Sequence, residues 1–325
     1  MLNLNSVTIN NFFSIKNIEL NNLKDKKEIY IVGENGDGKT LLLQAIAVGL
    51  KGTIEDGLED FRKRENEFSI EIENKESIKD YFFAYGGSRN SNCQIKEDKA
   101  GYLTLFSGEY DLYNPTQWLI ELYNAQNAKA ELVISLSDAI KLLQNMLNRD
   151  IEIEVTYNSV RFIEKGSEVS FEQLSSGYKS VITIICDLIY RFSQIQQVSN
   201  ISEFKGVVLI DEVELHLHPK WQYRFMQKLR ELFPNIQFIV TTHSATVILG
   251  SSIDAVYYSI YKESGNTKIS KPQSIKSKFI NEIQLNIFGF DINSEILNNN
   301  LNHNKQKQQK AKDALLNLID INKEK

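Results

Sequence analysis

The chain has 325 residues, of which 42% are hydrophobic and 24% charged, and its 37 Lys and Arg against 42 Asp and Glu give a formal net charge of -5. This composition is ordinary for a globular protein with a real core, and the weak acidity argues against a protein that coats nucleic acid through its overall field. Apolar runs stay below the roughly 18 residues of a transmembrane helix, and the N-terminus lacks the pattern of a secretory signal. Cys93 and Cys186 form no C-x-x-C pair, so we expect neither a disulfide framework nor a zinc ribbon, and a cytoplasmic location fits.

Strand and helix patterns alternate along the chain. Strands are expected within residues 1–32, 68–74, 80–85, 151–166, 206–210 and 237–244, and helices at 40–50, at 177–193 and from Pro219 to just before Pro234. The strands at 206–210 and 237–244 are apolar on both faces, which is typical of the centre of a parallel sheet. Residues 91–150 begin polar and then show helical spacing, which predicts a helical insertion.

A glycine-rich segment, GENGDGKT at residues 33–40, follows an apolar strand and matches G-x-x-x-x-G-K-[ST]. Its glycines let backbone N–H groups point at phosphate oxygens, and the helix that follows adds a partial positive charge. A plain glycine-rich turn is the alternative, but the strand–loop–helix context favours phosphate binding. We expect Lys39 to reach the β- and γ-phosphates and the Thr40 hydroxyl to ligate Mg²⁺. The predicted nucleotide-binding residues of this segment are Gly33, Asn35, Gly36, Gly38, Lys39 and Thr40.

Two acidic residues, Asp211 and Glu212, directly follow the apolar strand GVVLI. Phosphoryl transfer needs a carboxylate near Mg²⁺ and a second group that orients the attacking water, so we assign these roles to Asp211 and Glu212 respectively. Acids at a strand end are common by themselves, and the phosphate loop upstream favours the functional interpretation. A zinc site built from His216 and His218 with Glu212 and Glu214 is the rival interpretation, but no third ligand has supportive spacing.

Two further segments belong to the predicted site. His243 ends another apolar strand, where it can donate to a γ-phosphate, although a histidine satisfied in the core is the alternative. Parallel strands bring their carboxyl ends to one edge, so Gly33, Asp211 and His243 are expected to converge. The segment LSSGY precedes a helix. Ser176 and the Gly177 backbone N–H can cap the N-terminus of that helix or bind an anion there.

The four segments, in this order, resemble those of ABC-type ATPases of the SMC/RecF/OLD group. GENGDGKT is similar to Walker A, LSSGY (174–178) to the signature motif, VVLIDEVELHLHP to Walker B with the D-loop, and TTHS to the switch histidine. The resemblance covers about residues 1–290 and implies an α/β fold, a P-loop ATPase head with a mixed central sheet and a helical insertion. The ELHLHP continuation, AYGGSR (84–89) and the opening INNFFSIKNIEL look most like bacterial anti-phage defence ATPases of the Septu and retron-associated kind.

This resemblance implies ATP and Mg²⁺ as cofactors and a homodimer that closes head to tail around two ATP molecules and can join a higher assembly. Lys39, Thr40, Asp211 and Glu212 would act in cis, with Lys39, Glu212 and His243 as the catalytic residues and Thr40 and Asp211 as the metal ligands. Ser176 and Gly177 would act in trans, on the ATP of the other subunit.

The expected divisions of the chain are residues 1–90 and 151–290 as the two lobes of the ATPase core, 91–150 as the insertion and 291–325 as a polar tail. The signature LSSGY departs from the LSGGQ of transporters, so no membrane partner is expected. No Q-loop glutamine is identifiable. Arg89 lies near its place, either in contact with phosphate or a partner subunit or as a solvated loop residue. Sustained heptads and an acidic glycine-rich run after His243 are lacking, so neither an SMC coiled coil nor a TOPRIM nuclease is expected.

The leading hypothesis is an ATPase that dimerises on ATP and regulates a separate effector, such as an HNH nuclease, or engages DNA, in anti-phage defence. The alternatives are a RecF-like DNA repair or recombination ATPase and a nucleotide-dependent switch with little turnover. The basic segment at Lys305, Lys307, Lys310 and Lys312 is either a DNA contact or a solvated tail. Since the motifs occupy most of the chain, we expect it to be one half of an ATP-gated dimer whose effector is another molecule.

Overall fold

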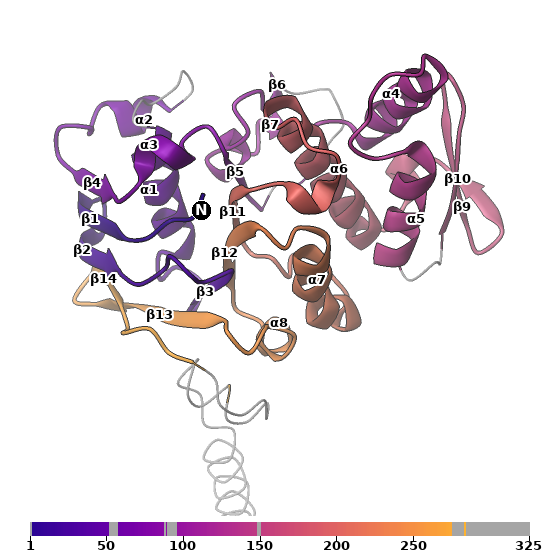
Figure 1. Ribbon diagram of the computed structural model, residues 1–325. Coiled ribbons are helices and arrows are strands. Elements are labelled where there is room, and N and C mark those ends of the chain that lie inside the picture. Colours follow the sequence, from indigo (N-terminus) through magenta and orange to yellow (C-terminus); the bar gives the residue numbers. More distant parts are fainter. Residues whose placement is uncertain are drawn as a thin grey trace, which may run out of the picture. The chain divides into compact units, whose positions relative to one another are not determined.

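The computed structural model describes residues 2–51, 58–87, 89, 96–147, 151–274 and 283. The chain divides into two compact units, Met1–Lys276 and Ser277–Lys325, and all elements below belong to the first (Figure 1). The predicted tail at 291–325 and Cys93 lie outside the described residues. Within the described part of the chain, every helix is too short or too polar to cross a membrane.

A nine-stranded mixed sheet forms the centre of this unit, in the order β4-β1-β2-β14-β13-β3-β12-β11-β5. Its strands are β1 (Val7–Phe12), β2 (Ile15–Leu20), β3 (Glu28–Val32), β4 (Ser69–Ile72), β5 (Phe82–Tyr85), β11 (Gly206–Ile210), β12 (Ile236–Thr242), β13 (Val256–Glu263) and β14 (Asn266–Ile269). The neighbours from β13 to β5 pair in parallel, whereas β1 pairs antiparallel with β2 and with β4. The α/β class with a mixed central sheet is therefore confirmed.

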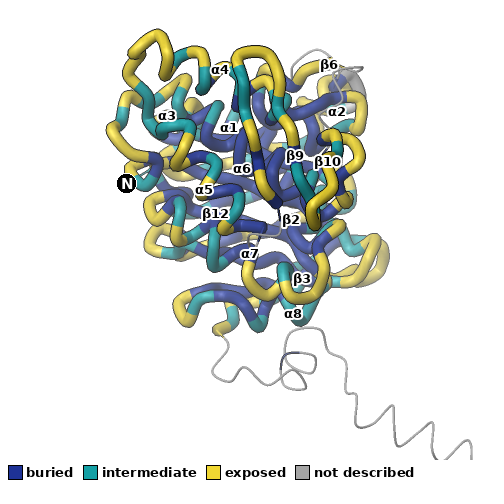
Figure 2. The backbone as a smooth tube through the Cα atoms, turned by 90° about the vertical axis from the view of Figure 1, so that its right-hand side faces the viewer, coloured by how far each residue is buried: buried dark blue, intermediate teal, exposed yellow. Residues whose placement is uncertain are grey.

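Four neighbouring parallel strands of the sheet are buried along their whole length. Every residue of β3, β5, β11 and β12 is buried, because these strands are rich in the β-branched and aromatic residues that pack on a covered sheet. Figure 2 shows these buried segments in the interior of the first unit, with exposed loops around them. Since β3, β11 and β12 run in the same direction, their carboxyl ends lie at one edge.

The helices lie on both sides of these strands. Helix α1 (Lys39–Lys51) lies on the side of β1 and β4, whereas α6 (Ser176–Ile195) and α7 (Pro219–Leu232) lie on the opposite side of β11 and β12 (Figure 1). The predicted start of α7 at Pro219 is confirmed, since proline suits the first helical position. The shorter helices are α2 (Glu59–Arg62), α3 (Lys75–Ile78), α8 (Ala245–Leu249) and the 3-10 turns Leu103–Leu105, Phe171–Gln173 and Ile201–Glu203.

The predicted insertion is helical in its second half. A two-stranded pair, β6 (Lys96–Glu97) and β7 (Tyr110–Asp111), comes first, followed by α4 (Pro115–Asn127) and α5 (Leu136–Met146). Both helices contact α6 and the next strand, β8 (Ile151–Val155). That strand forms a separate antiparallel sheet with β9 (Val160–Glu164) and β10 (Ser167–Val169). The strand β8, which follows the predicted boundary at residue 150, buries Ile151 and Ile153.

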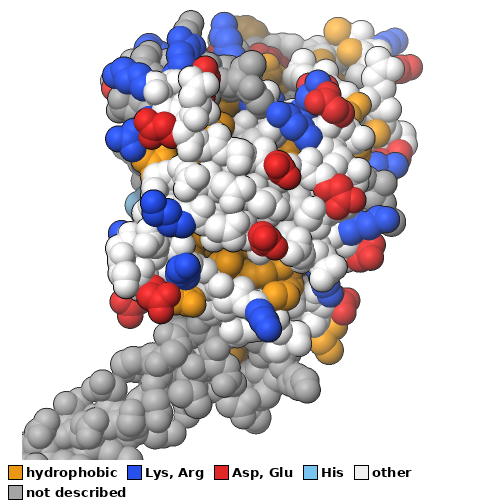
Figure 3. All heavy atoms as spheres, turned by 90° about the vertical axis from the view of Figure 1, so that its left-hand side faces the viewer, with side chains coloured by type: hydrophobic (Ala, Val, Ile, Leu, Met, Phe, Trp, Pro, Cys, Tyr) orange, Lys and Arg blue, Asp and Glu red, His pale blue; other side chains and the backbone are white. Residues whose placement is uncertain are grey.

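Charge is mixed over the face of the unit at the β1 end of the sheet. Figure 3 shows acidic and basic side chains interspersed over the described part of this face, in keeping with the small net charge of -5.

Candidate nucleotide-binding site

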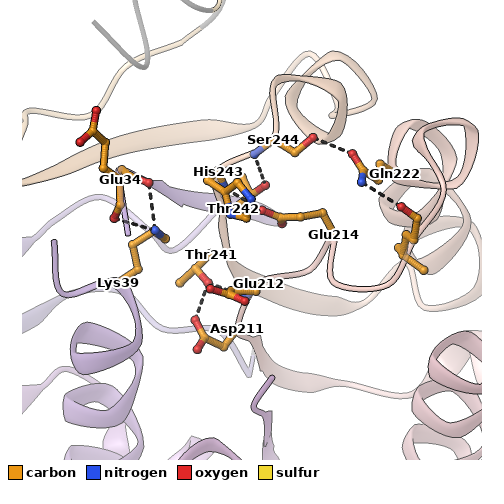
Figure 4. Close-up of polar contacts among 12 residues, drawn as sticks. Glu34, Lys39, Asp211, Glu212, Glu214, Gln222, Thr241, Thr242, His243 and Ser244 are labelled. Carbon is orange, nitrogen blue, oxygen red and sulfur yellow. Dashed lines mark hydrogen bonds and ion pairs between the residues drawn. The ribbon is translucent and has the colours of Figure 1, made fainter. Parts of the chain in front are cut away.

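The phosphate loop spans the gap between the end of β3 and the start of α1. Gly36 and Gly38 have φ values of +91° and +103°, a conformation that glycine adopts without steric cost. The Lys39 ammonium donates to the carbonyl oxygens of Gly33 and Glu34, both at 2.9 Å (Figure 4), and the Asp37 carboxylate accepts the Glu34 N–H at 2.8 Å. The loop is thus tightly folded, with its lysine buried.

The hairpin of β13 and β14 packs directly against this loop. A Cβ atom at Gly33 would lie 2.4 Å from the carbonyl oxygen of Ile260, and one at Gly38 would lie 2.9 Å from the Thr267 hydroxyl. Glycine is therefore required at Gly33 by close approach and at Gly38 by both approach and conformation.

The acid at the end of β11 contacts the phosphate loop. Thr40 Oγ1 donates to Asp211 Oδ2 at 2.6 Å, and Thr241 Oγ1 donates to Asp211 Oδ1 at 2.5 Å. Asp211 is buried, and its carboxylate beside the Thr40 hydroxyl offers the oxygen ligands that Mg²⁺ prefers. The two residues fit the predicted metal-binding pair.

Glu212, the next residue, is half-buried and has a left-handed backbone with φ of +45°. Its N–H donates to Thr241 Oγ1 at 2.7 Å, and in Figure 4 its side chain lies beside Asp211 and Thr241. The structure thus places both acids at the strand edge where the phosphate loop begins.

His243 lies just beyond β12 and is held by Glu214, a residue whose role the sequence did not predict. Glu214 Oε1 accepts the backbone N–H of His243 at 2.7 Å and lies 2.8 Å from its Nδ1. The Glu214 side chain is 5% exposed and that of His243 is 50% exposed. Because Nδ1 faces this carboxylate, Nε2 is the ring nitrogen left for a ligand.

The zinc interpretation is not supported by the structure. No group of three or more His, Cys, Asp or Glu side chains among the described residues is arranged to hold a metal ion. His216 and His218 are exposed, and His218 instead caps α7 through its Nδ1, which accepts the Lys220 N–H at 3.4 Å.

The signature segment lies beside the loop that precedes α7. Ser175 caps α6 by accepting the Tyr178 N–H at 3.3 Å, so Ser176 is the first helical residue and is exposed. An open pocket of about 590 Å³ is lined by residues that include Ser175, Ser176, Gly177, His216, His218 and Trp221. The residues that line it include none from the phosphate loop.

Arg89 is not a solvated loop residue, so that alternative is wrong. Its side chain is 6% exposed, and its guanidinium donates to the carbonyl oxygens of Asp211 (3.0 Å), Glu212 (2.7 Å) and Leu215 (3.2 Å) and to the Ser180 hydroxyl (3.1 Å). Burial lowers the pKa of Arg89 to about 10, while the nearby carboxylates, Glu214 foremost, act in the opposite direction. Arg89 is therefore charged at neutral pH and bonded within its own chain.

The chain is similar in sequence to several known proteins. Residues 119–248 match the family model described as AAA ATPase domain. The chain is 27% identical over 285 residues to Septu protein PtuA of Bacillus mycoides, covering 76% of this chain and 39% of that protein. It is 28% identical over 279 residues to the Retron Ec83 probable ATPase of Escherichia coli, covering 70% of this chain and 50% of that protein. The chain thus spans half or less of the length of these relatives.

Two further matches are more limited in length or in structural overlap. The Retron Vc95 probable ATPase of Vibrio cholerae is 47% identical over 87 residues, which cover 26% of this chain and 17% of that protein. An SMC head bound to the C-winged helix domain of ScpA superimposes with a TM-score of 0.49 at 11% identity, over 84% of this chain and 98% of that one. The resemblance inferred from the motifs is confirmed: residues 119–248 match the AAA ATPase domain model, and the chain is similar to the Septu and retron ATPases.

Proposed function

We propose that the chain binds and hydrolyses ATP. The observation that supports this most strongly is the 2.6 Å hydrogen bond from Thr40 to Asp211, which joins the phosphate loop to the acid at the end of β11. A loop that presents backbone N–H groups and a lysine supplies the phosphate site, and an adjacent carboxylate supplies the metal site.

Each residue then has one task. Lys39 would exchange its carbonyl partners for phosphate oxygens. Thr40 and Asp211 would hold Mg²⁺, which would supply positive charge to neutralise the phosphates. Glu212 orients the attacking water. His243, fixed by Glu214, directs Nε2 at the γ-phosphate. Gly33, Asn35, Gly36 and Gly38 provide the backbone that surrounds the phosphates.

We place Ser176 and Gly177 on the nucleotide of a second copy of the chain. Their pocket is lined by residues that include none from the phosphate loop, which supports a role on the phosphate of another subunit. A two-fold dimer with two composite sites satisfies this requirement.

The biological setting that we propose is anti-phage defence, with ATP-dependent dimerisation controlling a separate effector. The similarity to Septu protein PtuA and the Retron Ec83 probable ATPase supports this setting. HNH nucleases and DNA are the effector and the ligand to test first.

The test of the ATPase proposal is Glu212→Gln beside Lys39→Ala. We expect Glu212→Gln to bind ATP as the wild type does, to lose turnover by about 100-fold or more and to accumulate a dimer, because the water is no longer activated. Lys39→Ala should lose ATP binding, since the phosphates lose their cation. Equilibrium binding of labelled ATP, phosphate release and light scattering measure the three properties. Wild-type turnover in Glu212→Gln would refute the proposed role of Glu212.

A further inference from the structure

Glu212 has a backbone conformation that its side chain disfavours. Its φ of +45° lies in the left-handed region, which a non-glycine residue occupies only where the surroundings determine it strongly. Residues held in this way concentrate at functional sites. The direction of the Glu212 side chain depends on this backbone, so whatever fixes the backbone also aims the carboxylate.

Hydrogen bonds fix both peptide planes that flank the Glu212 Cα. In the plane before it, the Glu212 N–H donates to Thr241 Oγ1 at 2.7 Å and the Asp211 carbonyl accepts from Arg89 Nη2 at 3.0 Å. In the plane after it, the Glu212 carbonyl accepts from the same Arg89 nitrogen at 2.7 Å. Rotation about either backbone bond of Glu212 would therefore break a bond to Arg89.

The other end of the guanidinium is anchored on two elements. Arg89 Nη1 donates to the Ser180 hydroxyl at 3.1 Å and to the Leu215 carbonyl at 3.2 Å. Ser180 lies on α6, one turn after Ser176, and is itself buried. The guanidinium thus ties the turn after β11 to the helix that begins with the signature segment.

Arginine is the side chain that suits this place. Its planar guanidinium presents donors in a fixed fork, whereas the lysine ammonium is a single point of charge on a flexible stem. The buried cation also lies near the carboxylates of Asp211, Glu212 and Glu214, which compensate for its loss of water.

We infer that Arg89 is a positioning residue, which holds the Glu212 backbone left-handed and so aims the Glu212 carboxylate at the attacking water. The inference rests on the proposed function, because it gives Arg89 a purpose only through the role of Glu212. Arg89 itself contacts neither nucleotide nor water in this assignment, and it acts entirely through the backbone of the turn.

The test is a double-mutant cycle of Arg89→Lys and Glu212→Gln in the full chain, with turnover measured per bound ATP. Arg89→Lys should lower turnover about 100-fold, the scale of a 1 Å misplacement, and leave ATP affinity within about threefold. In the Glu212→Gln background it should lower the residual turnover no further, because the group that it aims is gone. An equal drop in both backgrounds, or no drop in either, would overturn the inference.

Two companion variants keep the result interpretable. Arg191→Lys changes another buried arginine, which is 7% exposed and bonded to Asp187 and to the Asp98 carbonyl, and it should keep wild-type turnover. A comparable drop there would show that the loss of any buried guanidinium suffices and would overturn the inference. If Arg89→Lys fails to fold, Ser180→Ala removes one anchor of the guanidinium and should lower turnover about fivefold, again only while Glu212 is present.

The two proposals fail in different ways. Wild-type turnover in Glu212→Gln overturns the role of Glu212, and that of Arg89 with it. Lost turnover in Glu212→Gln together with full turnover in Arg89→Lys overturns the Arg89 inference alone.

Discussion

Thr241 is the residue on which the two acids at the end of β11 depend. Its hydroxyl donates to Asp211 Oδ1 and accepts the Glu212 N–H, while Thr40 occupies the other oxygen of Asp211. A single buried hydroxyl therefore orients the side chain of one acid and the backbone of the next.

Thr241→Val should destabilise the protein by about 1–3 kcal/mol, because two buried polar groups lose their partner while the shape of the side chain is kept. Urea unfolding with an unchanged m-value measures the difference. Thr183→Val is the matched control, since the Thr183 hydroxyl is buried in α6 and has no hydrogen-bond partner among the described residues. We expect no loss, or a gain, at Thr183. Equal losses at both positions would show that the bonds of Thr241 contribute nothing specific.

Sequence reasoning assigned roles to some of these residues and missed the bonding partners of others for a physical reason. Lys39, Thr40, Asp211 and Glu212 are recognisable because a phosphate loop and a strand-end acid are local patterns with fixed spacing. Glu214, Thr241 and Arg89 work through hydrogen bonds between distant segments, from Arg89 to Glu212 for example, which no local spacing encodes. The structure supplies these partners, and the roles of the site residues stay predictions.

At the signature segment, the start of helix α6 packs closely against the loop before α7 and the first turn of α7. A Cβ atom at Gly177 would lie 2.8 Å from the backbone oxygen of His216, and the Tyr178 and Trp221 rings pack with centroids 4.9 Å apart. The start of α6 thus approaches the loop as closely as a glycine permits.

Gly177→Ala should cost about 1–3 kcal/mol of stability through overpacking and lower turnover, because the added methyl group displaces the loop or the helix start. ATP affinity should stay unchanged, since the phosphate loop is untouched. Thermal unfolding, ATP binding and phosphate release measure these effects. Gly87→Ala is the control, because its Cβ would lie 3.5 Å from a Leu215 methyl group, an ordinary contact. Wild-type behaviour of Gly177→Ala would contradict the close packing.

The sequence predicted the helices and strands themselves more completely than it predicted which of them pack together. The strands at 206–210 and 237–244 and the helix at Pro219 follow from apolar runs and from proline. Alternation in residues 151–166 correctly indicated strands but does not state which sheet a strand joins. That choice depends on α4 and α5, which cover β8.

At the scale of the whole molecule, the proposed dimer can be tested with two variants that are each inactive alone. Ser176→Arg should block turnover by placing a bulky cation in the pocket that Ser176 and Gly177 line, while ATP binding persists. Lys39→Ala should also be inactive, because it loses ATP binding while its signature segment stays intact.

Mixing the two inactive variants should restore turnover, because each mixed dimer joins the intact phosphate loop of one chain to the intact signature segment of the other. In an equal mixture, about half of the dimers are mixed and each has one working site, so recovery should approach about a quarter of the wild-type rate. Phosphate release from the mixture measures it. In the control mixture, a chain with both Lys39→Ala and Ser176→Arg replaces the Lys39→Ala chain, so no dimer has a working site. No recovery in the first mixture would place the signature residues in cis.

The hairpin behind the phosphate loop has a consequence for how the protein is made. Gly33 and Gly38 pack against Ile260 and Thr267, and β3 lies between β12 and β13. The loop is therefore synthesised before its supporting strands, which leave the ribosome more than two hundred residues later. Such non-local pairing forms late, so a nascent chain has no completed phosphate site, and ATP can assist only the last stage of its folding.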